Sequence, residues 1–493
     1  METRKRLLNS SVLLGASRLA CQLLAFLRNL LLARLLSKED FGIASIFAAV
    51  LTVLELNNRL GFGLQLVQSP QNPSERLQAT AHTLQGLSGF ISFLLIAAIA
   101  PQLARIFGVP DAWPYFALIG GVTLIEGLTH LDPQRVQRDM DFRPGVMIEL
   151  IPQILVTIAI WPVTQLLPDY RSIVALTLAK SAVTLPLSLM FSQRPYRWAW
   201  DPEDARRLLR FGWPLLATSL LVFGGQKADQ MLVGASFSLT ALASYGLAFS
   251  LVSIPWTTFG QIAASLCLPL LSKAQNRSAE FIRIYARSSE LSAVWGTTLL
   301  LPLIIAGEQL TQALYGSRYS GTGPFIAALG AASALRFLRH APALAALARG
   351  DTVSQLTSNL WRATSLPLAA GCWTAGGEPI HIAWCAIVGE LLSFGAGTLR
   401  LRRTCGIGLR IHLPALGYLT ACLSAGLTIA HLWTSRLGLL GAGGAAIAAA
   451  TMAFLSAMML FPHLRAELMI TTNLLFRRIW KRENRGSEVV ASP

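Results

Sequence analysis

The sequence predicts an all-α polytopic membrane protein, and three observations support this fold class. The chain has 493 residues, of which 53% are hydrophobic and only 13% charged, whereas a soluble domain carries about a quarter charged residues. Apolar stretches of about 20 residues, the length that crosses a hydrocarbon core of about 30 Å, recur along the chain. Lys and Arg concentrate in alternate loops between these stretches, as expected for helices that alternate in direction.

Each long apolar stretch is expected to form one transmembrane helix, which gives about fourteen helices. The first six spans are expected at residues 9–36, 41–66, 80–106, 114–131, 145–167 and 170–192. The others are expected at residues 211–236, 239–270, 288–314, 323–348, 352–374, 378–399, 411–433 and 437–461. This order predicts two pseudo-symmetric six-helix lobes, in residues 1–200 and 201–405, then two additional transmembrane helices in 406–461 and a basic cytoplasmic tail in 462–493.

The formal net charge of +16 is interpreted as membrane topology rather than as a nucleic-acid interface. In membrane proteins, excess Lys and Arg collect in short cytoplasmic loops. The arginine-rich loop 400–410 and the basic tail fall on the same side as the N-terminus, so we expect both termini in the cytoplasm. The opposite loops, such as 37–40 and 374–379, are too short to hold a folded domain, which argues against an enzyme that acts outside the membrane.

An internal repeat relates the two predicted lobes. Phe41–Gly42 follows the first span as Tyr245–Gly246 follows the seventh, and Arg6–Leu8 corresponds to Arg207–Leu209. The offset of about 200 residues contains six spans, so the halves would keep the same orientation and form parallel repeats. A chance match of short apolar words is the alternative. Transporters built from such repeats bind substrate near the bilayer midplane, between the halves.

Basic side chains inside the expected spans give the best indication of function. Each costs roughly 2.5 to 3.5 kcal/mol at a bilayer centre, so several together need water, an anion or an acidic partner. They are Arg18, Arg28, Arg34, Arg59, Lys180, Lys227, Arg336, Arg339 and Arg362. Arg34 lies close to an outer helix end and is interpreted as a structural anchor that snorkels to the interface.

Acidic residues in or near the expected spans are fewer, and we note Glu55, Glu126, Asp229, Glu308 and Glu390. Structural pairing is an equal alternative for any single cation, with Lys227–Asp229 and Arg59–Glu55 as local candidates. Pairing these acids still leaves several positive charges without a counter-charge. A cavity with excess positive charge needs an anion, and the mixture of forked Arg and compact Lys suits phosphate or diphosphate. Residue type alone leaves sulfate, carboxylate and nucleotide open.

Polar side chains accompany these cations in the first span of each half. Gln22 and Asn29 share a helical face with Arg18, and Gln226 and Gln230 lie beside Lys227.

Motifs for enzymatic chemistry are not visible in the sequence. The seven histidines and six cysteines lack metal-ligand spacing, and neither a phosphate-cradling Gly-rich loop nor a nucleophile elbow occurs. We therefore expect a transporter without a metal or other cofactor. His340, beside Arg339, is a candidate proton-coupling group, and Asp229 and Glu390 are further candidates for ion coupling. A structural role is the alternative for each of the three.

Several short sequences over residues 5–275 resemble those of a known family. They are Leu31–Ala44 (LLARLLSKEDFGIA), Asn58–Gln68 (NRLGFGLQLVQ), Val136–Arg143 (VQRDMDFR), Arg210–Pro214 (RFGWP), Asp229–Gly234 (DQMLVG) and Ser244–Ala248 (SYGLA). In order and spacing they are similar to the polysaccharide-export (Wzx-like) flippases of the multidrug/oligosaccharidyl-lipid/polysaccharide (MOP) superfamily. The resemblance implies a V-shaped protein with two six-helix lobes and two extra C-terminal helices.

The resemblance also implies a function, that of a flippase for undecaprenyl-diphosphate-linked oligosaccharide in the bacterial cytoplasmic (inner) membrane. Transport would proceed by alternating access, coupled to a proton or sodium gradient or to the membrane potential. We expect the diphosphate and acidic sugars to bind Arg18, Arg28, Lys180, Lys227, Arg336 and Arg362 in a two-sided cationic cleft. The residues expected at its vestibule or in ion coupling are Gln22, Asn29, Arg59, Gln226, Asp229, Gln230, Arg339 and His340.

The expected cargo is an O-antigen or exopolysaccharide repeat unit, and the expected partners are membrane lipid and the polymerase and glycosyltransferases of the same pathway. A flippase for the peptidoglycan lipid precursor is the nearest alternative. A drug or cation exporter of the same superfamily should instead place acids at the midplane. A membrane glycosyltransferase or polymerase is the alternative from another class, although such enzymes generally need a larger loop or a carboxylate pair. A structural scaffold would leave the cations in the spans without explanation.

Overall fold

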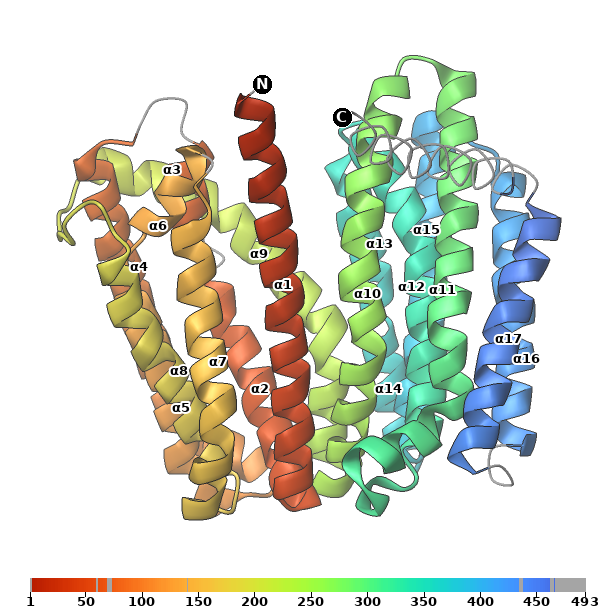
Figure 1. The fold of residues 1–493 in the computed structure, drawn as a ribbon, viewed down its shortest axis with the longest axis horizontal. Helices are drawn as coiled ribbons and strands as arrows, with labels where there is room; N and C mark the ends of the chain where they lie inside the picture. The colour runs from red at the N-terminus through yellow and green to blue at the C-terminus, as the bar shows by residue number, and fades with distance from the viewer. Residues whose placement is uncertain are drawn as a thin grey trace, which may run out of the picture. The chain divides into compact units, whose positions relative to one another are not determined.

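The protein is helical almost throughout, which confirms the predicted all-α class (Figure 1). The computed structural model describes residues 2–58, 61–68, 73–139, 141–433, 438–461 and 465. Within these ranges no β-strand occurs. Nine helices in this part of the chain are long and apolar enough to cross a membrane. The predicted total of fourteen spans stays a prediction, and the tail at 462–493 lies outside the described residues except for Arg465.

The described residues of the first half include eight α-helices. Their bounds are α1 Glu2–Leu35, α2 Lys38–Asn58, α3 Phe62–Gln68, α4 Glu75–Ile106, α5 Trp113–Gly127, α6 Asp132–Arg135, α7 Arg143–Leu166 and α8 Arg171–Met190. Two 3-10 turns, η1 (Pro110–Ala112) and η2 (Val136–Asp139), complete this half. The single span expected at 41–66 is divided between α2 and α3. Gly61 has a φ of 69° between them, a left-handed conformation that ends a helix and that glycine adopts without steric cost.

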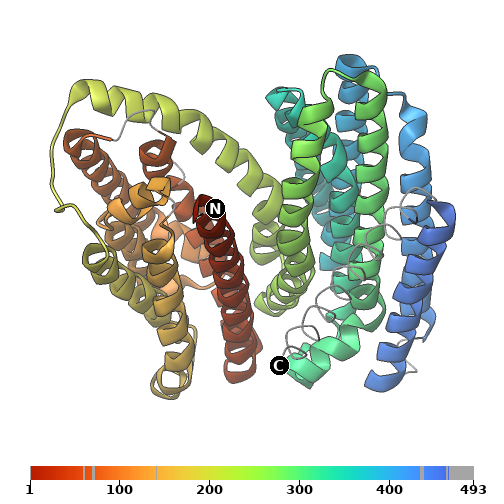
Figure 2. The same ribbon diagram turned by 45° about the horizontal axis from the view of Figure 1, so that its top comes forward.

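The second half contains longer helices. Their bounds are α9 Pro202–Ser236, α10 Leu239–Ala274, α11 Ser278–Tyr315, α12 Gly323–Ala348, α13 Thr352–Ala363, α14 Ser365–Thr374, α15 Pro379–Cys405, α16 Leu413–Trp433 and α17 Leu439–Leu460. The turns η3 (Ser317–Tyr319) and η4 (Leu409–His412) lie between them. The span expected at 352–374 is two helices, because Pro367 lacks an N–H and its ring disfavours a continuous helix through Ala363. Figure 2 shows α9 as one continuous helix after the loop 191–201.

The chain divides by its contacts into two compact units. The N-terminal unit comprises Met1–Gly246 and Leu314–Tyr319, and the C-terminal unit comprises Leu247–Ala313 and Ser320–Pro493. The boundary falls within α10, close to the internal repeat. The lobes predicted at 1–200 and 201–405, with a further pair of helices at 406–461, stay a prediction.

In the N-terminal unit, α4 packs against α5, α7 packs against α1 and α8, and α2 packs against α9. The rings of Phe47 and Phe116 meet edge to face at 4.8 Å in the buried interior. The two glycines of the internal repeat lie at close helix contacts of this unit. A Cβ on Gly42 would be 2.3 Å from the Leu239 carbonyl oxygen, and one on Gly246 would be 2.8 Å from Ser45 Oγ. Gly42 faces backbone atoms and therefore requires the smallest residue, whereas a Cβ on Gly246 would displace side chains.

In the C-terminal unit, α12 is the most buried helix and packs against α13, α15 and α16. Small residues dominate its buried surface, including Gly330, Ala331 and Ala334. They let neighbouring helices approach closely, as at membrane helix interfaces generally. This helix carries Arg336 and Arg339 into the interior of the unit.

Candidate substrate-binding sites

Three arginines of the C-terminal unit converge on one buried carboxylate. Glu390 Oε1 accepts the Nε–H of Arg336 at 2.9 Å and forms an ion pair with Arg362, whose Nε lies 2.7 Å away. Glu390 Oε2 accepts the Nε–H of Arg339 at 2.9 Å. Side-chain exposure is 1% for Glu390, 8% for Arg336 and Arg362, and 14% for Arg339. We call these four residues the arginine cluster.

Helix geometry explains how the arginine cluster assembles. Arg336 and Arg339 are three residues apart on α12, so they lie on one face. Arg362 is in the last turn of α13, and Glu390 lies within α15. Gly389 brings the two helices together, because a Cβ there would be 2.7 Å from the Arg362 carbonyl oxygen. The close approach depends on this glycine.

The four charged groups of the arginine cluster sum to +2, because three guanidinium groups face one carboxylate. Arg336 and Arg339 donate to Glu390 through Nε–H, and the Nε of Arg362 is the atom nearest to it. Arg339 Nη1 also donates to Asn359 Oδ1 at 3.4 Å. Desolvation of a charge is costly, and one carboxylate compensates only part of it. The cluster is therefore electrostatically suited to an anion. A guanidinium held through Nε presents its Nη edge in the geometry that phosphate oxygens favour.

A polar pocket of about 400 Å³ lies within the N-terminal unit. It is bounded by α1, the ends of α5 and α6, and the helices α7 and α8. Its charged lining consists of Arg18, Glu126, Glu149 and Lys180, which sum to zero. Its other lining residues are Ser17, Thr129, His130, Pro133, Gln134, Gln137, Phe142, Gly145, Val146, Ile148, Thr184 and Ser188. We call it the N-unit pocket.

Asp132 fixes the loop that forms one wall of the N-unit pocket. Its Oδ1 accepts Arg135 Nε–H at 2.6 Å, and its Oδ2 accepts the Gln193 backbone N–H at 2.7 Å. Burial alone would raise the pKa of Asp132, but these bonds and the backbone N–H of Arg194 outweigh it and hold the pKa below its usual value. The pocket wall is therefore a rigid element rather than a loose loop.

Lys227, Asp229 and Gln230 occupy a different place, on α9. Lys227 Nζ donates to Gln230 Oε1 at 3.1 Å, and Asp229 Oδ2 accepts the Tyr245 hydroxyl at 2.7 Å. Lys227 and Asp229 were noted as local candidates for pairing, although residues two apart on a helix do not face each other, and that pairing stays a prediction. The Asp229–Tyr245 bond joins two of the short sequences that carry the family resemblance. It connects α9 to α10.

The other predicted residues lie outside the arginine cluster and the N-unit pocket. Arg28 Nη1 reaches Gln153 Oε1 at 3.5 Å, and Gln22 and Asn29 are half-buried on α1. His340 packs edge-on against Trp256 with ring centroids 5.1 Å apart. Arg59 and the side chain of Gln226 lie outside the described residues.

Arg34 was expected to be a structural anchor that snorkels to the interface. Its side chain is exposed, and its Nε–H donates to the Leu314 carbonyl oxygen. The segment Leu314–Tyr319 lies against the end of α1, where Arg318 also donates to the Leu36 carbonyl oxygen. Snorkelling of Arg34 stays a prediction.

The predicted cations are therefore found in separate local environments. Arg18 and Lys180 line the N-unit pocket, Arg336 and Arg362 belong to the arginine cluster, and Lys227 is bonded within α9. The two-sided cleft that would combine them stays a prediction.

Sequence reasoning missed the role of two acids. Glu390 was noted as an acid in a span, but its position as the common acceptor of three arginines was not foreseen. Glu149 lies within the expected span 145–167 and was overlooked. An exhaustive search for acids within expected spans would have found Glu149, whereas the partners of Glu390 come from helices far apart in the sequence.

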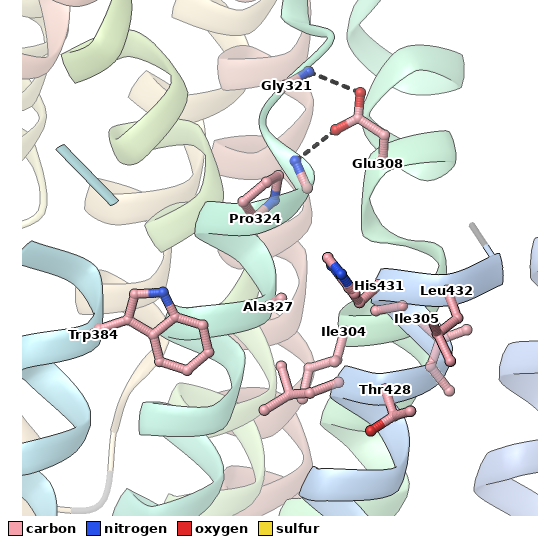
Figure 3. A pocket seen from close by; sticks show the side chains of 13 residues that line it. Ile304, Ile305, Glu308, Gly321, Pro324, Ala327, Trp384, Thr428, His431 and Leu432 are labelled. Carbon is pink, nitrogen blue, oxygen red and sulfur yellow. Dashed lines mark hydrogen bonds between the residues drawn. The ribbon is translucent and has the colours of Figure 1, made fainter. Parts of the chain in front are cut away.

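A second cavity, of about 640 Å³, lies in the C-terminal unit and is mainly apolar (Figure 3). Its walls include Ile304, Trp384 and Leu432, with His431 among the polar side chains. The Glu308 carboxylate, which also lines it, accepts the backbone N–H groups of Gly321, at 2.8 Å, and Gly323, at 2.6 Å. Glu308 thereby satisfies free N–H groups at the start of α12. The cavity suits hydrocarbon better than a diphosphate.

Comparison with known proteins places the chain in a family. Residues 31–324 match the family described as "Polysaccharide biosynthesis protein". The chain is 22% identical over 369 residues to the teichuronic acid biosynthesis protein TuaB of Bacillus subtilis (strain 168), covering 72% of this chain and 74% of that protein.

Solved structures with the same fold include a flippase and a drug transporter. The lipid II flippase MurJ, in an inward closed conformation, matches with a TM-score of 0.68 and 14% identity, over 92% of this chain and 98% of MurJ. An inward-facing multidrug resistance MATE transporter of the MOP superfamily matches with a TM-score of 0.64 and 14% identity, over 80% of this chain and 98% of that one. These likenesses confirm the predicted MOP fold. The chain is a multi-pass membrane protein that belongs to the polysaccharide biosynthesis protein family.

Proposed function

We propose that this protein is a flippase that moves undecaprenyl-diphosphate-linked polysaccharide repeat units across the bacterial cytoplasmic membrane by alternating access. The observation that carries the proposal is the arginine cluster, in which three guanidinium groups share one carboxylate inside a membrane-protein unit. A diphosphate supplies the negative charge that this cluster lacks. The family, the relative named for teichuronic acid biosynthesis and the fold of a lipid II flippase support a lipid-linked saccharide as the cargo.

In this proposal Arg336, Arg339 and Arg362 bind the diphosphate, and Glu390 holds the three guanidinium groups in place. The prenyl chain stays in lipid. No cofactor takes part, and a proton or sodium gradient or the membrane potential drives turnover. Both termini lie in the cytoplasm, where the pathway's glycosyltransferases would build the cargo, and a polymerase would receive it on the other side.

A flippase for the peptidoglycan lipid precursor is the second candidate, favoured by the likeness to MurJ. It shares the lipid diphosphate and differs in the sugars. A drug or cation exporter is disfavoured, because the arginine cluster carries excess positive charge and would repel an organic cation. Complementation separates the two flippase candidates. Only a flippase for the peptidoglycan lipid precursor would restore growth to cells depleted of their lipid II flippase.

The proposal is tested in cells that depend on this protein for polysaccharide export. Arg18, Lys227 and Arg362 are each changed to Ala, and the surface polymer and the protein level are measured. We expect normal protein levels and reduced export, with the largest loss for Arg362→Ala because a charge-assisted bond contributes about 1.5–3 kcal/mol. Arg277→Ala, which alters an exposed pair with Glu280, is the control. Unchanged polysaccharide export in all three variants would contradict the proposal.

A further inference from the structure

The N-unit pocket differs from the arginine cluster in charge and in exposure. Arg18 and Lys180 are balanced by Glu126 and Glu149, and both Arg18 and Glu149 are exposed. A second phosphate or carboxylate group would meet two carboxylates as well as two cations. The pocket therefore has no net charge with which to attract an anion.

The lining of the N-unit pocket contains both hydrogen-bond donors and acceptors. Arg18 and Lys180 donate, Glu126 and Glu149 accept, and the Gln137 side-chain amide can do both. A hydroxyl group also donates and accepts, whereas phosphate oxygens only accept. A ring that carries several hydroxyl groups is therefore a better match for this lining than a phosphate. Phe142 and Pro133 add apolar surface for the C–H face of such a ring.

The dimensions of the N-unit pocket are compatible with such a ligand. Its volume of about 400 Å³ lies within the range of about 300–1,000 Å³ found for small-molecule sites. Its wall is rigid, because Asp132 ties the loop at α6 to the backbone of Gln193. The Ser188 hydroxyl also accepts the His130 backbone N–H at 2.9 Å. A pre-formed wall lowers the ordering cost of binding.

We infer that the N-unit pocket is a saccharide subsite, which binds an uncharged, hydroxyl-bearing sugar of the lipid-linked head group. This inference rests on the proposed function and assigns the sugar and the diphosphate to different places. Lys180 and Arg18 donate to sugar oxygens, and Glu149 and Glu126 accept sugar hydroxyls. The pocket lies at the end of the unit where α5 ends and α7 begins, the end expected to face the cytoplasm.

The test compares two polyprenyl diphosphates, one with a free terminal phosphate and one that carries a glucosyl group on it. The purified full-length protein, in lipid nanodiscs, is titrated with undecaprenyl diphosphate and with glucosyl-diphosphoundecaprenol. The wild-type protein should bind the glucosylated lipid roughly tenfold more tightly, as one or two bonds between charged groups and hydroxyls would give. Glu149→Gln should remove most of this gain and leave the affinity for undecaprenyl diphosphate unchanged. Lys180→Met should also remove most of the gain.

Each outcome of the titration has a definite meaning. If the wild-type protein shows no gain from the sugar, or if both variants keep the full gain, the saccharide subsite is wrong while the diphosphate site stands. If neither lipid binds, the proposed function fails and the subsite fails with it. Glu280→Gln, in an exposed pair of the other unit, is the matched control for Glu149→Gln and should keep the gain. Thermal melting of each variant checks folding, and Lys180→Met gives an independent reading if Glu149→Gln is unstable.

Discussion

The arginine cluster and the N-unit pocket use the same residue types in opposite ways. In the arginine cluster, three guanidinium groups share the buried Glu390 and leave an excess of two positive charges. In the N-unit pocket, two cations face two carboxylates, and Arg18 and Glu149 are exposed. Burial removes the solvent that would otherwise stabilise a charge, so the cluster depends on its one acid. The pocket can exchange its partners with water or with a ligand.

This difference shows that a cation in an expected span has no single interpretation. Arg362 and Lys180 look alike in the sequence, since each lies near the middle of an apolar stretch. The first is held by a buried carboxylate, and the second lines a pocket. Their substitutions should therefore differ in their effect on stability and on ligand selectivity.

The largest expected difference is in folding stability between two isosteric Glu→Gln variants. Glu390→Gln removes the one carboxylate that the three guanidinium groups share and should cost about 3–5 kcal/mol of folding stability, the cost of breaking a buried ion pair. Glu149→Gln removes an exposed charge and should change stability by no more than about 0.5 kcal/mol. Chemical or thermal unfolding in detergent measures both. Equal stability of the two variants would show that the cluster is not held by Glu390.

A smaller effect is expected from two glycines of the same helix. An added Cβ at Gly389 would lie 2.7 Å from the Arg362 carbonyl oxygen, so Gly389→Ala should force α15 from α13 and cost about 1–3 kcal/mol. At Gly395, also in α15, an added Cβ would have no neighbour within 4 Å. Gly395→Ala should therefore stabilise the protein by about 0.5–1 kcal/mol, because glycine is costly within a helix. Melting temperatures that move in the same direction would refute this packing argument.

The smallest effect concerns acid pH and the loops at the helix ends. The Arg400 hydrogen bonds hold the pKa of Asp351 below its usual value, and the pKa of Asp132 is lowered as well. A carboxyl group with a depressed pKa stabilises the fold above its unfolded pKa, near 3.8, and loses that contribution as the pH falls through the folded pKa. The melting temperature should therefore decrease as the pH is lowered below about 4.

The variants Asp132→Asn and Asp351→Asn show how much each unit contributes to this pH dependence of the melting temperature. Asp132 is fully buried and bonded to Arg135, whereas Asp351 keeps 14% side-chain exposure beside Arg400. Asp132→Asn should therefore reduce the dependence of the melting temperature on acid pH more than Asp351→Asn does. A larger reduction from Asp351→Asn would reverse the order that we assign.

Much of the fold could be predicted from the sequence, because a transmembrane helix is a local pattern of apolar residues. The expected spans correspond to helices, and their ends shift where a local residue decides, as at Gly61 and Pro367. The longer helices α9 and α11 extend past the apolar stretch into polar sequence, which hydropathy does not register. The family resemblance was also confirmed, since residues 31–324 match the polysaccharide biosynthesis protein family.

The candidate sites were harder to predict, because their partners come from distant positions. Arg336, Arg362 and Glu390 lie on three helices, and nothing local in the sequence brings them together. Lys227 and Asp229 were local candidates for pairing because they are near in sequence, and the structure shows Lys227 bonded to Gln230 and Asp229 bonded to Tyr245. The excess of positive charge in the expected spans predicted the arginine cluster better than any single proposed ion pair did. It is a property of the whole set and does not depend on which residues meet.

The central claim is that the excess positive charge of the arginine cluster binds the lipid diphosphate that the protein moves. This claim is tested by measuring the movement of glucosyl-diphosphoundecaprenol across the bilayer of proteoliposomes. The wild-type protein is compared with the double variant Arg336→Gln/Arg362→Gln. This variant leaves Arg339 and Glu390 as a neutral pair, so folding should be retained while the excess charge is lost. The account predicts transport reduced at least roughly tenfold, as the loss of charge-assisted bonds implies, and normal transport in Arg277→Gln. Wild-type transport by the folded double variant would contradict the account.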